Sequence, residues 1–214
     1  MPSYYIPSEK KSQQQEELLA ALQAKFADSL VESAIVSGEV AITIKKESVL
    51  AVFKELRDNA KFLFKQLMDI VAIDYPERDE RFEVVYLLLS LDNNLRLRVK
   101  INIAEEFIVD SLSSIYSNSD WLEREVYDMF GIYFGEHKDL RRILTDFGFE
   151  GSPLRKDFPL SGFVEVEFNE ELQRVVYKPV ELNQAYREFT SENPWMGEAQ
   201  VDTFNYLNKK AKAD

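Results

Sequence analysis

The residues best suited to chemistry in this 214-residue chain gather between Trp121 and Leu160. Glu123, Glu125 and Asp128 fall within six positions, and carboxylates held close together can act as general acid and base because each shifts the pKa of the other. Arg124 lies among them, so a solvated helix face with ion pairs explains the same pattern. Both interpretations place these side chains on one short helix.

The only histidine, His137, could act as a base or as a metal ligand. A metal at His137 would need carboxylates for its other protein ligands, because the chain has no cysteine and no repeated histidine spacing. The pattern favours a structural or hydrogen-bonding role. The absence of cysteine also excludes disulfides, thiolate nucleophiles and iron–sulfur clusters held by this chain.

Basic residues follow His137, but acidic residues are interleaved with them. Five positive and four negative side chains lie between Lys138 and Asp157, and the whole chain has a formal charge of −12. This balance argues against nucleic acid as a partner, since such binding needs concentrated Lys and Arg. It favours salt-bridged contact with a mixed protein surface, where Arg pairs with carboxylates through two hydrogen bonds.

The elements that must position these residues follow from periodicity. Helical spacing predicts helices around 18–26 and 49–56, and alternation or β-branched runs predict strands at 40–44, 69–75, 82–91 and 95–103. Two further short helices are expected, one beginning near Asp110 and one after Asp120. Asp120 and Glu123 have the spacing of a capping box, and Gly131 is a plausible end for the second of these helices.

This order of elements predicts an α+β fold, with a mainly antiparallel sheet and helices packed on one face. We expect a flexible N-terminus over residues 1–12, the α+β domain over 13–130, and an extended C-terminal tail with little core of its own over 131–214. Within the tail, 163–168 and 173–177 could form a hairpin. No apolar run approaches the roughly 18 residues of a membrane span, and the N-terminus lacks the features of a signal or import sequence.

Several segments resemble one family, in the same order along the chain. These are DIVAIDYPER, FEVVYLLLSL and RLRVKI, then EREVYDMFGIYF, H-x-DLRRILTDFGFEG and PLRKDFPL, and finally VVYKPVELNQAYREF and NPW. Together they resemble the 30-kDa subunit of respiratory complex I, the proton-translocating NADH:quinone oxidoreductase. The chain departs from the family pattern at Glu136 and Lys138, where we expect Gly and Pro, and at Ser152, where we expect His.

The resemblance implies a non-catalytic structural and assembly subunit of the peripheral arm, which supports electron transfer from NADH to quinone. It implies no cofactor or metal in this chain, whereas the complex as a whole carries FMN, iron–sulfur clusters and quinone. The expected partners are the large quinone-site subunit and the iron–sulfur subunits. The expected location is peripheral, on the cytoplasmic side of the bacterial inner membrane or, alternatively, the matrix side of the mitochondrial inner membrane.

The resemblance also marks a set of residues as structural or partner-binding residues. They are Glu123, Arg124, Glu125, Asp128, His137, Asp139, Arg141, Arg142, Arg155, Lys156 and Asp157. The alternative hypothesis is a freestanding acid/base enzyme that uses Glu123, Glu125 or His137.

Overall fold

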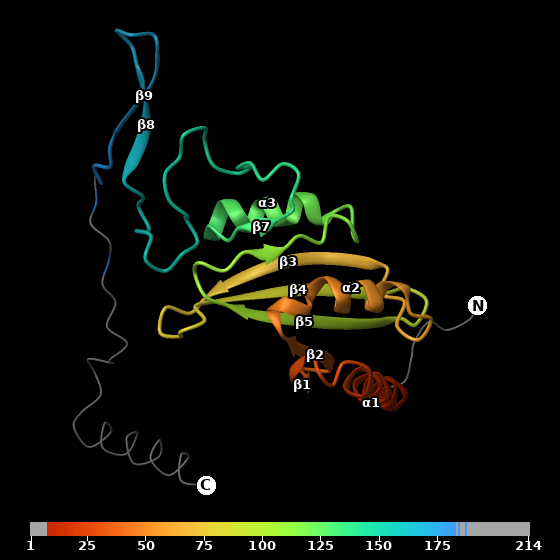
Figure 1. Cartoon of the computed structure of the whole chain (residues 1–214). Coiled ribbons are helices and arrows are strands. Elements are labelled where there is room, and N and C mark those ends of the chain that lie inside the picture. Colours follow the sequence, from red (N-terminus) through yellow and green to blue (C-terminus); the bar gives the residue numbers. More distant parts are fainter. Residues whose placement is uncertain (1–7, 183, 185–186, 188–214) are drawn as a thin grey trace, which may run out of the picture. The chain divides into compact units, whose positions relative to one another are not determined.

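A five-stranded mixed sheet organises the first part of the chain (Figure 1). The computed structural model describes residues 8–182, 184 and 187, and it divides into one unit that ends at Gly162 and a second that begins at Phe163. The sheet belongs to the first unit and has the order β1-β2-β5-β4-β3. Only β2 and β5 pair in parallel, and the other three pairs are antiparallel. The prediction of a mainly antiparallel sheet is therefore confirmed. The strands are β1 (Leu30–Val36), β2 (Glu39–Ile44), β3 (Gln66–Asp74), β4 (Phe82–Ser90) and β5 (Leu95–Ile103).

The sequence predicts four of these strands, and it does not predict β1. β5 shows why alternation is a reliable signal: Leu97, Val99 and Ile101 are buried on one face, while basic side chains occupy the other. β1 lacks this signal, because Val31 and Val36 are exposed on the edge of the sheet. It joins β2 through a two-residue turn of Ser37 and Gly38, both with positive φ, which suits the twist of a tight hairpin.

Three helices pack on the sheet: α1 (Ser8–Lys25), α2 (Val49–Asp58) and α3 (Ser119–Phe130). A short 3-10 turn, η1 (Lys46–Ser48), precedes α2. Leu22 of α1, Phe53 of α2 and Val126 of α3 join one hydrophobic core with the buried strand residues. Full burial of a side chain such as Leu22 or Phe53 contributes about 1.5–3 kcal/mol. The predicted α+β class, with helices on one face, is confirmed. α1 begins at Ser8, inside the segment that we expected to be flexible.

The helix predicted near Asp110 is wrong. Val109–Asp110 forms a two-residue strand, β6, which pairs in parallel with β7 (Phe134–Gly135). The capping box is also wrong, because α3 has Asn118 at its N-cap and the Glu123 side chain is buried. The predicted helix end is confirmed: Gly131 has a left-handed φ of 76° and its N–H donates to the Tyr127 carbonyl at 2.9 Å.

The first unit extends beyond Phe130, where we expected the folded domain to end. Ile132 and Phe134 lie in the hydrophobic core, and the Leu154 N–H donates to the Met129 carbonyl at 3.0 Å. Residues 131–162 have little regular structure of their own, but they are part of the first unit. The physical reason is that polar side chains of the sheet and of α3 hold this segment, and the sequence pattern does not reveal such contacts.

The second unit contains the predicted hairpin, β8 (Val164–Asn169) paired antiparallel with β9 (Arg174–Pro179). The Val180 N–H donates to the Phe163 carbonyl at 3.2 Å and extends the pairing by one bond. The remainder of the predicted tail over residues 188–214 and the first seven residues lie outside the described part of the chain.

Candidate functional site

α3 carries most of the polar residues of the candidate site, and it presents them on different sides. Glu123 lies three and seven positions before the buried Val126 and Phe130, so it shares their inward stripe. Arg124 and Asp128, four positions apart, share another side, which faces the segment after residue 138. Glu125 is exposed to solvent. The structure therefore separates the three carboxylates that the sequence brings together.

Glu123 is a fully buried carboxylate with hydrogen bonds to both oxygens. Its Oε2 accepts from the Ser111 hydroxyl at 2.6 Å, and its Oε1 accepts from the Leu112 N–H at 2.7 Å. Burial raises the pKa of Glu123, and these hydrogen bonds together with the nearby His137 oppose that rise. Glu123 thus fixes the start of the segment between β6 and α3, where no helix forms.

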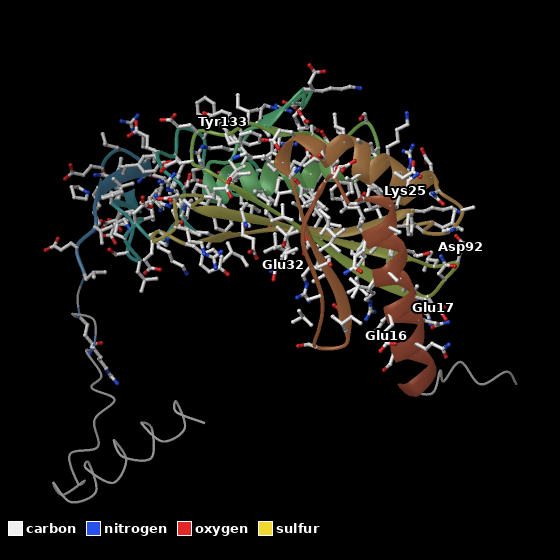
Figure 2. All side chains as sticks on the ribbon, turned by 60° about the horizontal axis from the view of Figure 1, so that its bottom comes forward. Glu16, Glu17, Lys25, Glu32, Asp92 and Tyr133 are labelled. Atoms are coloured by element: carbon white, nitrogen blue, oxygen red, sulfur yellow. The ribbon has the colours of Figure 1, made fainter. Side chains whose placement is uncertain are left out.

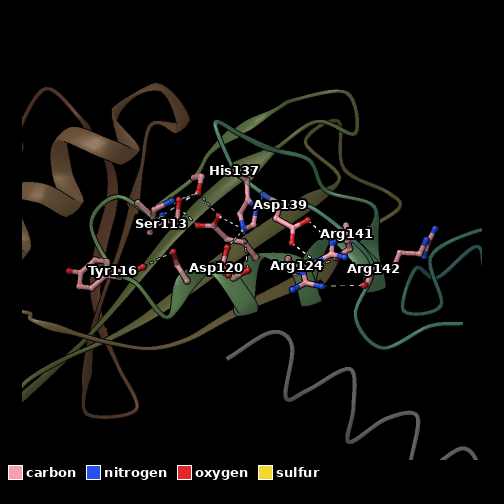
Figure 3. A network of polar contacts seen from close by, with 12 residues as sticks. Ser113, Tyr116, Asp120, Arg124, His137, Asp139, Arg141 and Arg142 are labelled. Carbon is pink, nitrogen blue, oxygen red and sulfur yellow. Dashed lines mark hydrogen bonds and ion pairs between the residues drawn. The ribbon is translucent and has the colours of Figure 1, made fainter. Parts of the chain in front are cut away.

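His137 is also fully buried and is held from both ring nitrogens (Figure 3). The Asp139 N–H donates to Nδ1 at 3.1 Å, so Nε2 carries the proton. Nε2 lies 3.1 Å from the Asp120 carbonyl oxygen and 3.2 Å from the Asp120 carboxylate. The Glu123 carboxylate is farther away, at 3.9 Å. The histidine ties the start of α3 to the turns that follow β7.

Asp128 holds the loop over residues 142–145 through both carboxylate oxygens. Oδ2 accepts three backbone N–H groups, from Ile143, Leu144 and Thr145, at 3.0, 2.7 and 2.9 Å. Oδ1 accepts from the Thr145 hydroxyl at 2.6 Å and from Arg142 at 2.8 Å. Burial alone would raise the pKa of Asp128, but the hydrogen bonds from residues 143–145 outweigh it and hold that pKa well below its usual range.

Arg124, Asp139 and Arg141 form a more exposed rim on the same loop (Figure 3). Arg124 donates to the carbonyl oxygens of Arg141 and Arg142 at 3.0 and 3.4 Å, and its guanidinium lies over the Trp121 ring. Arg141 binds Asp139 through two nitrogens, at 2.6 and 2.7 Å, but the arginine is largely exposed. Such a pair stabilises a fold little, because solvent screens it.

A second polar cluster fixes residues 155–157 to the sheet. Asp74, buried at the end of β3, accepts from two nitrogens of Arg81 at 2.6 and 2.8 Å and from the Lys156 N–H at 2.7 Å. The hydrogen bonds from Arg81 lower the pKa of Asp74 despite its burial. Arg81 also binds Asp157 at 3.1 Å. The Lys156 backbone, rather than its side chain, makes the contact with Asp74.

Arg155 closes this cluster. Its guanidinium donates to Asp157 at 3.1 and 3.0 Å and reaches Glu105 at 2.5 Å. Arg155 and Arg81 together lower the pKa of Asp157. Sequence reasoning missed Asp74, Arg81 and Glu105. A usable signal was the position of Asp74, because an aspartate at the buried end of an apolar strand requires a partner.

The arrangement offers no open reactive centre. The side chains of Glu123 and His137 are fully buried and their polar atoms are engaged, whereas Glu125 is exposed and apart from them. Among the residues that the structure describes, no group of three or more His, Asp or Glu could hold a metal ion. Within this set, Arg124, Asp128 and His137 hold residues 137–145. Arg155 and Asp157 hold the end of the irregular segment to Glu105 and Arg81, beside the sheet.

Comparison with known proteins decides the family. Residues 42–164 match the family model described as respiratory-chain NADH dehydrogenase, 30 Kd subunit. The chain belongs to this family. The match covers β3, β4 and β5 and the loops that Asp128 and Asp74 hold, so it includes the whole candidate site. The resemblance inferred from the sequence motifs is confirmed.

Relatives from three bacteria, each named as a subunit of NADH-quinone oxidoreductase, extend the family match. One from Bartonella bacilliformis is 48% identical over 92% of this chain and 95% of its own length. Those from Paramagnetospirillum magneticum and Brucella ovis are 52% and 48% identical over 75% and 85% of this chain, and 80% and 90% of their own lengths. The chain is thus similar to bacterial subunits of a respiratory enzyme complex over most of their length.

Two solved structures share the fold of the family. One, described as a trypsin-resistant fragment (1-134) of Nqo5, is 30% identical with a TM-score of 0.50, and covers 59% of this chain and 99% of the fragment. The other, from the membrane-bound sulfane sulfur reductase, an archaeal respiratory membrane complex, has a TM-score of 0.59 at 23% identity and covers 68% and 85% of the two chains. In the described part of this chain, no helix has the length and hydropathy to cross a membrane.

Proposed function

We propose that this chain is a non-catalytic structural and assembly subunit in the peripheral arm of a proton-translocating NADH:quinone oxidoreductase, where it supports electron transfer from NADH to quinone. The β8–β9 hairpin is the observation that carries this proposal. A two-stranded hairpin is marginally stable in water, so it needs a surface to lie on. A subunit that binds its neighbours through such a hairpin contributes contacts rather than catalysis.

One face of the hairpin is apolar and exposed. The register places Val166 opposite Tyr177 and Phe168 opposite Val175, so these four side chains share a face. Each is more than half exposed. This is the composition of a protein contact, in which aromatic and β-branched side chains become buried.

The other face is mainly polar, with Val176 opposite Glu167 on it. Lys178 binds Glu165 at 3.2 Å and Glu167 at 2.6 Å. The two faces of the hairpin therefore differ: the polar face suits solvent, and the apolar face suits a neighbouring subunit.

The proposed partners are the large quinone-site subunit and the iron–sulfur subunits, and the proposed location is the cytoplasmic side of the bacterial inner membrane, as a peripheral component. The bacterial relatives support this location. We further propose that the chain holds no cofactor. Its lack of cysteine supports this, because it has no thiolate for an iron–sulfur cluster.

Co-purification tests the proposal. An affinity-tagged chain should purify from detergent-solubilised membranes together with NADH:quinone reductase activity. Phe168→Glu, on the apolar face, should reduce this recovery, whereas the matched change Glu167→Gln on the polar face should not. A tagged chain recovered alone, from cells whose complex assembles fully without it, would overturn the proposal.

The alternative of a freestanding acid/base enzyme finds no support in the comparisons. The geometry also argues against it, since Glu123 and His137 are buried and bound to protein groups. A substrate could not reach their polar atoms without breaking these hydrogen bonds.

A further inference from the structure

A groove of about 570 Å³ lies beside the C-terminal end of α3, within the first unit. Ile108 and Tyr133 form part of its wall, and both are exposed, at 61% and 57%. Figure 2 shows the Tyr133 side chain on the outer surface. Exposed large side chains that border a groove are typical of a contact site. The residues that line this groove belong to the first unit, whereas the hairpin belongs to the second.

The groove is held in a fixed shape. The Tyr133 ring packs edge-on against Tyr127 of α3, with 5.2 Å between ring centres. The Val109 N–H donates to the Tyr133 carbonyl at 2.9 Å, so the β6–β7 pairing fixes the backbone beside both Ile108 and Tyr133. A wall that is ordered before binding loses little conformational entropy when a partner docks.

Gly131 sets the distance between the end of α3 and the loop around Ser152. A Cβ at Gly131 would meet the Ser152 hydroxyl at 2.9 Å, and both residues line the groove. The loop around Ser152 can therefore lie directly against the end of α3.

The charges of the groove decide what kind of ligand it suits. Arg142 and Arg155 both line it, which would suggest an anion site. However, Arg142 binds Asp128, and Arg155 binds Asp157 and Glu105, so carboxylates of this chain already neutralise both guanidiniums. Neither arginine is available to a phosphate or to an anionic lipid headgroup without breaking these pairs. Glu106, which is exposed, also lines the groove, so its charge further disfavours an anionic ligand. The exposed Ile108 and Tyr133 instead suit an apolar side chain.

We propose that this groove receives an apolar side chain from another subunit of the complex, with Ile108 and Tyr133 as the contact residues. This inference rests on the proposed function, which supplies the neighbouring subunit. It identifies a second contact surface, on the first unit, in addition to the hairpin. Tyrosine is among the residues that contribute most to binding energy when an interface buries them.

Photo-crosslinking within the assembled complex tests the occupant directly. A benzoyl-phenylalanine in place of Ile108, in the full chain, should crosslink to a different subunit, which mass spectrometry can identify. The matched control position is Leu91, 73% exposed in the turn between β4 and β5. This turn lies at the opposite end of β5 from Glu105, about 30 Å away along the strand. A crosslink from position 108 to this same chain or to a second copy of it, or none at all, would overturn the inference.

Competition provides a second measurement. When tagged Tyr133→Ala and untagged wild-type chains are expressed together, the variant should be under-represented in the purified complex by about tenfold or more. Leu91→Ala should compete equally with the wild type. Equal incorporation of Tyr133→Ala would count against the inference even if crosslinks form. Failure of the proposed function gives a different result, because then the wild-type chain itself would not purify with a complex.

Discussion

Asp128→Asn should strongly weaken the hold of α3 on the loop over residues 142–145. The carboxylate accepts from three backbone N–H groups on one oxygen, and from Thr145 and Arg142 on the other. An amide has only one acceptor oxygen, so its NH₂ must face either the three N–H groups or the Arg142 guanidinium. Hydrogen bonds to a charged group contribute about 1.5–3 kcal/mol each, and breaking a buried ion pair costs about 3–5 kcal/mol. Since Arg142 is partly exposed and can be resolvated, we expect a total loss of about 2–4 kcal/mol.

Two measurements locate this loss. Urea unfolding of the purified full chain, followed by circular dichroism, reports any change in the global free energy of unfolding. Hydrogen exchange of the amides of residues 143–145 reports local opening of the loop. Asp139→Asn is the matched control, because Asp139 is bound to Arg141 at the surface and should leave both measurements unchanged. If Asp128→Asn also left the urea midpoint and these exchange rates at their wild-type values, the reasoning would be refuted.

The pH dependence of Asp128 gives an independent check. Its pKa is lower in the folded chain than the ordinary value of about 3.9. The carboxylate therefore stabilises the fold fully above pH 4 or so, and this contribution is lost as the pH falls below that value. The Asn variant should lose less stability on acidification than the wild type. Parallel acid-unfolding curves would contradict this assignment.

Two further predictions concern the other buried and exposed charges. Glu123→Gln should change the free energy of unfolding by no more than about 1 kcal/mol, because its amide oxygen can accept from the Leu112 N–H and its NH₂ can donate to the Ser111 hydroxyl. Glu123→Ala loses both hydrogen bonds and should cost about 2–4 kcal/mol. Equal losses for the two variants in urea titrations would contradict this. Since burial raises the pKa of Glu123, its contribution declines as the pH rises above about 4.3, and the Gln variant should lack that decline. Arg155→Ala should lower the melting temperature by about 2–4 °C, because it removes the contacts of Arg155 with Asp157 and Glu105. Arg141→Ala should leave the melting temperature unchanged. An unchanged melting temperature for Arg155→Ala in calorimetry would show that its two contacts contribute nothing.

The sequence predicts those elements whose burial follows a simple period. β5 alternates strictly, and α2 carries its buried Val52, Phe53 and Leu56 on one side. β1 escapes prediction because it is an edge strand with an irregular burial pattern. The Ser37-Gly38 pair between two β-branched runs is the local signal that could have revealed the β1–β2 hairpin.

The candidate site is less predictable because its contacts join residues far apart in the chain. Adjacent carboxylates on α3 suggest a cluster, yet Glu123 faces the core and Asp128 faces a loop. The helix expected at Asp110 fails because Glu123 captures the Leu112 N–H and the Ser111 hydroxyl instead. Asp74 binds the backbone of Lys156, 82 positions away, and no local pattern encodes such a pairing.

The bond between Asp74 and Lys156 makes one part of the chain conditional on another. The carboxylate reaches the correct place only when the end of β3 has formed and Arg81 has paired with it. Bringing Asp74 and Lys156 together closes a long loop, which costs conformational entropy. The contacts of the folded sheet must offset that cost. The final conformation of residues 155–157 therefore depends on a folded end of β3. A partner that binds these residues would therefore bind only a chain whose sheet has folded.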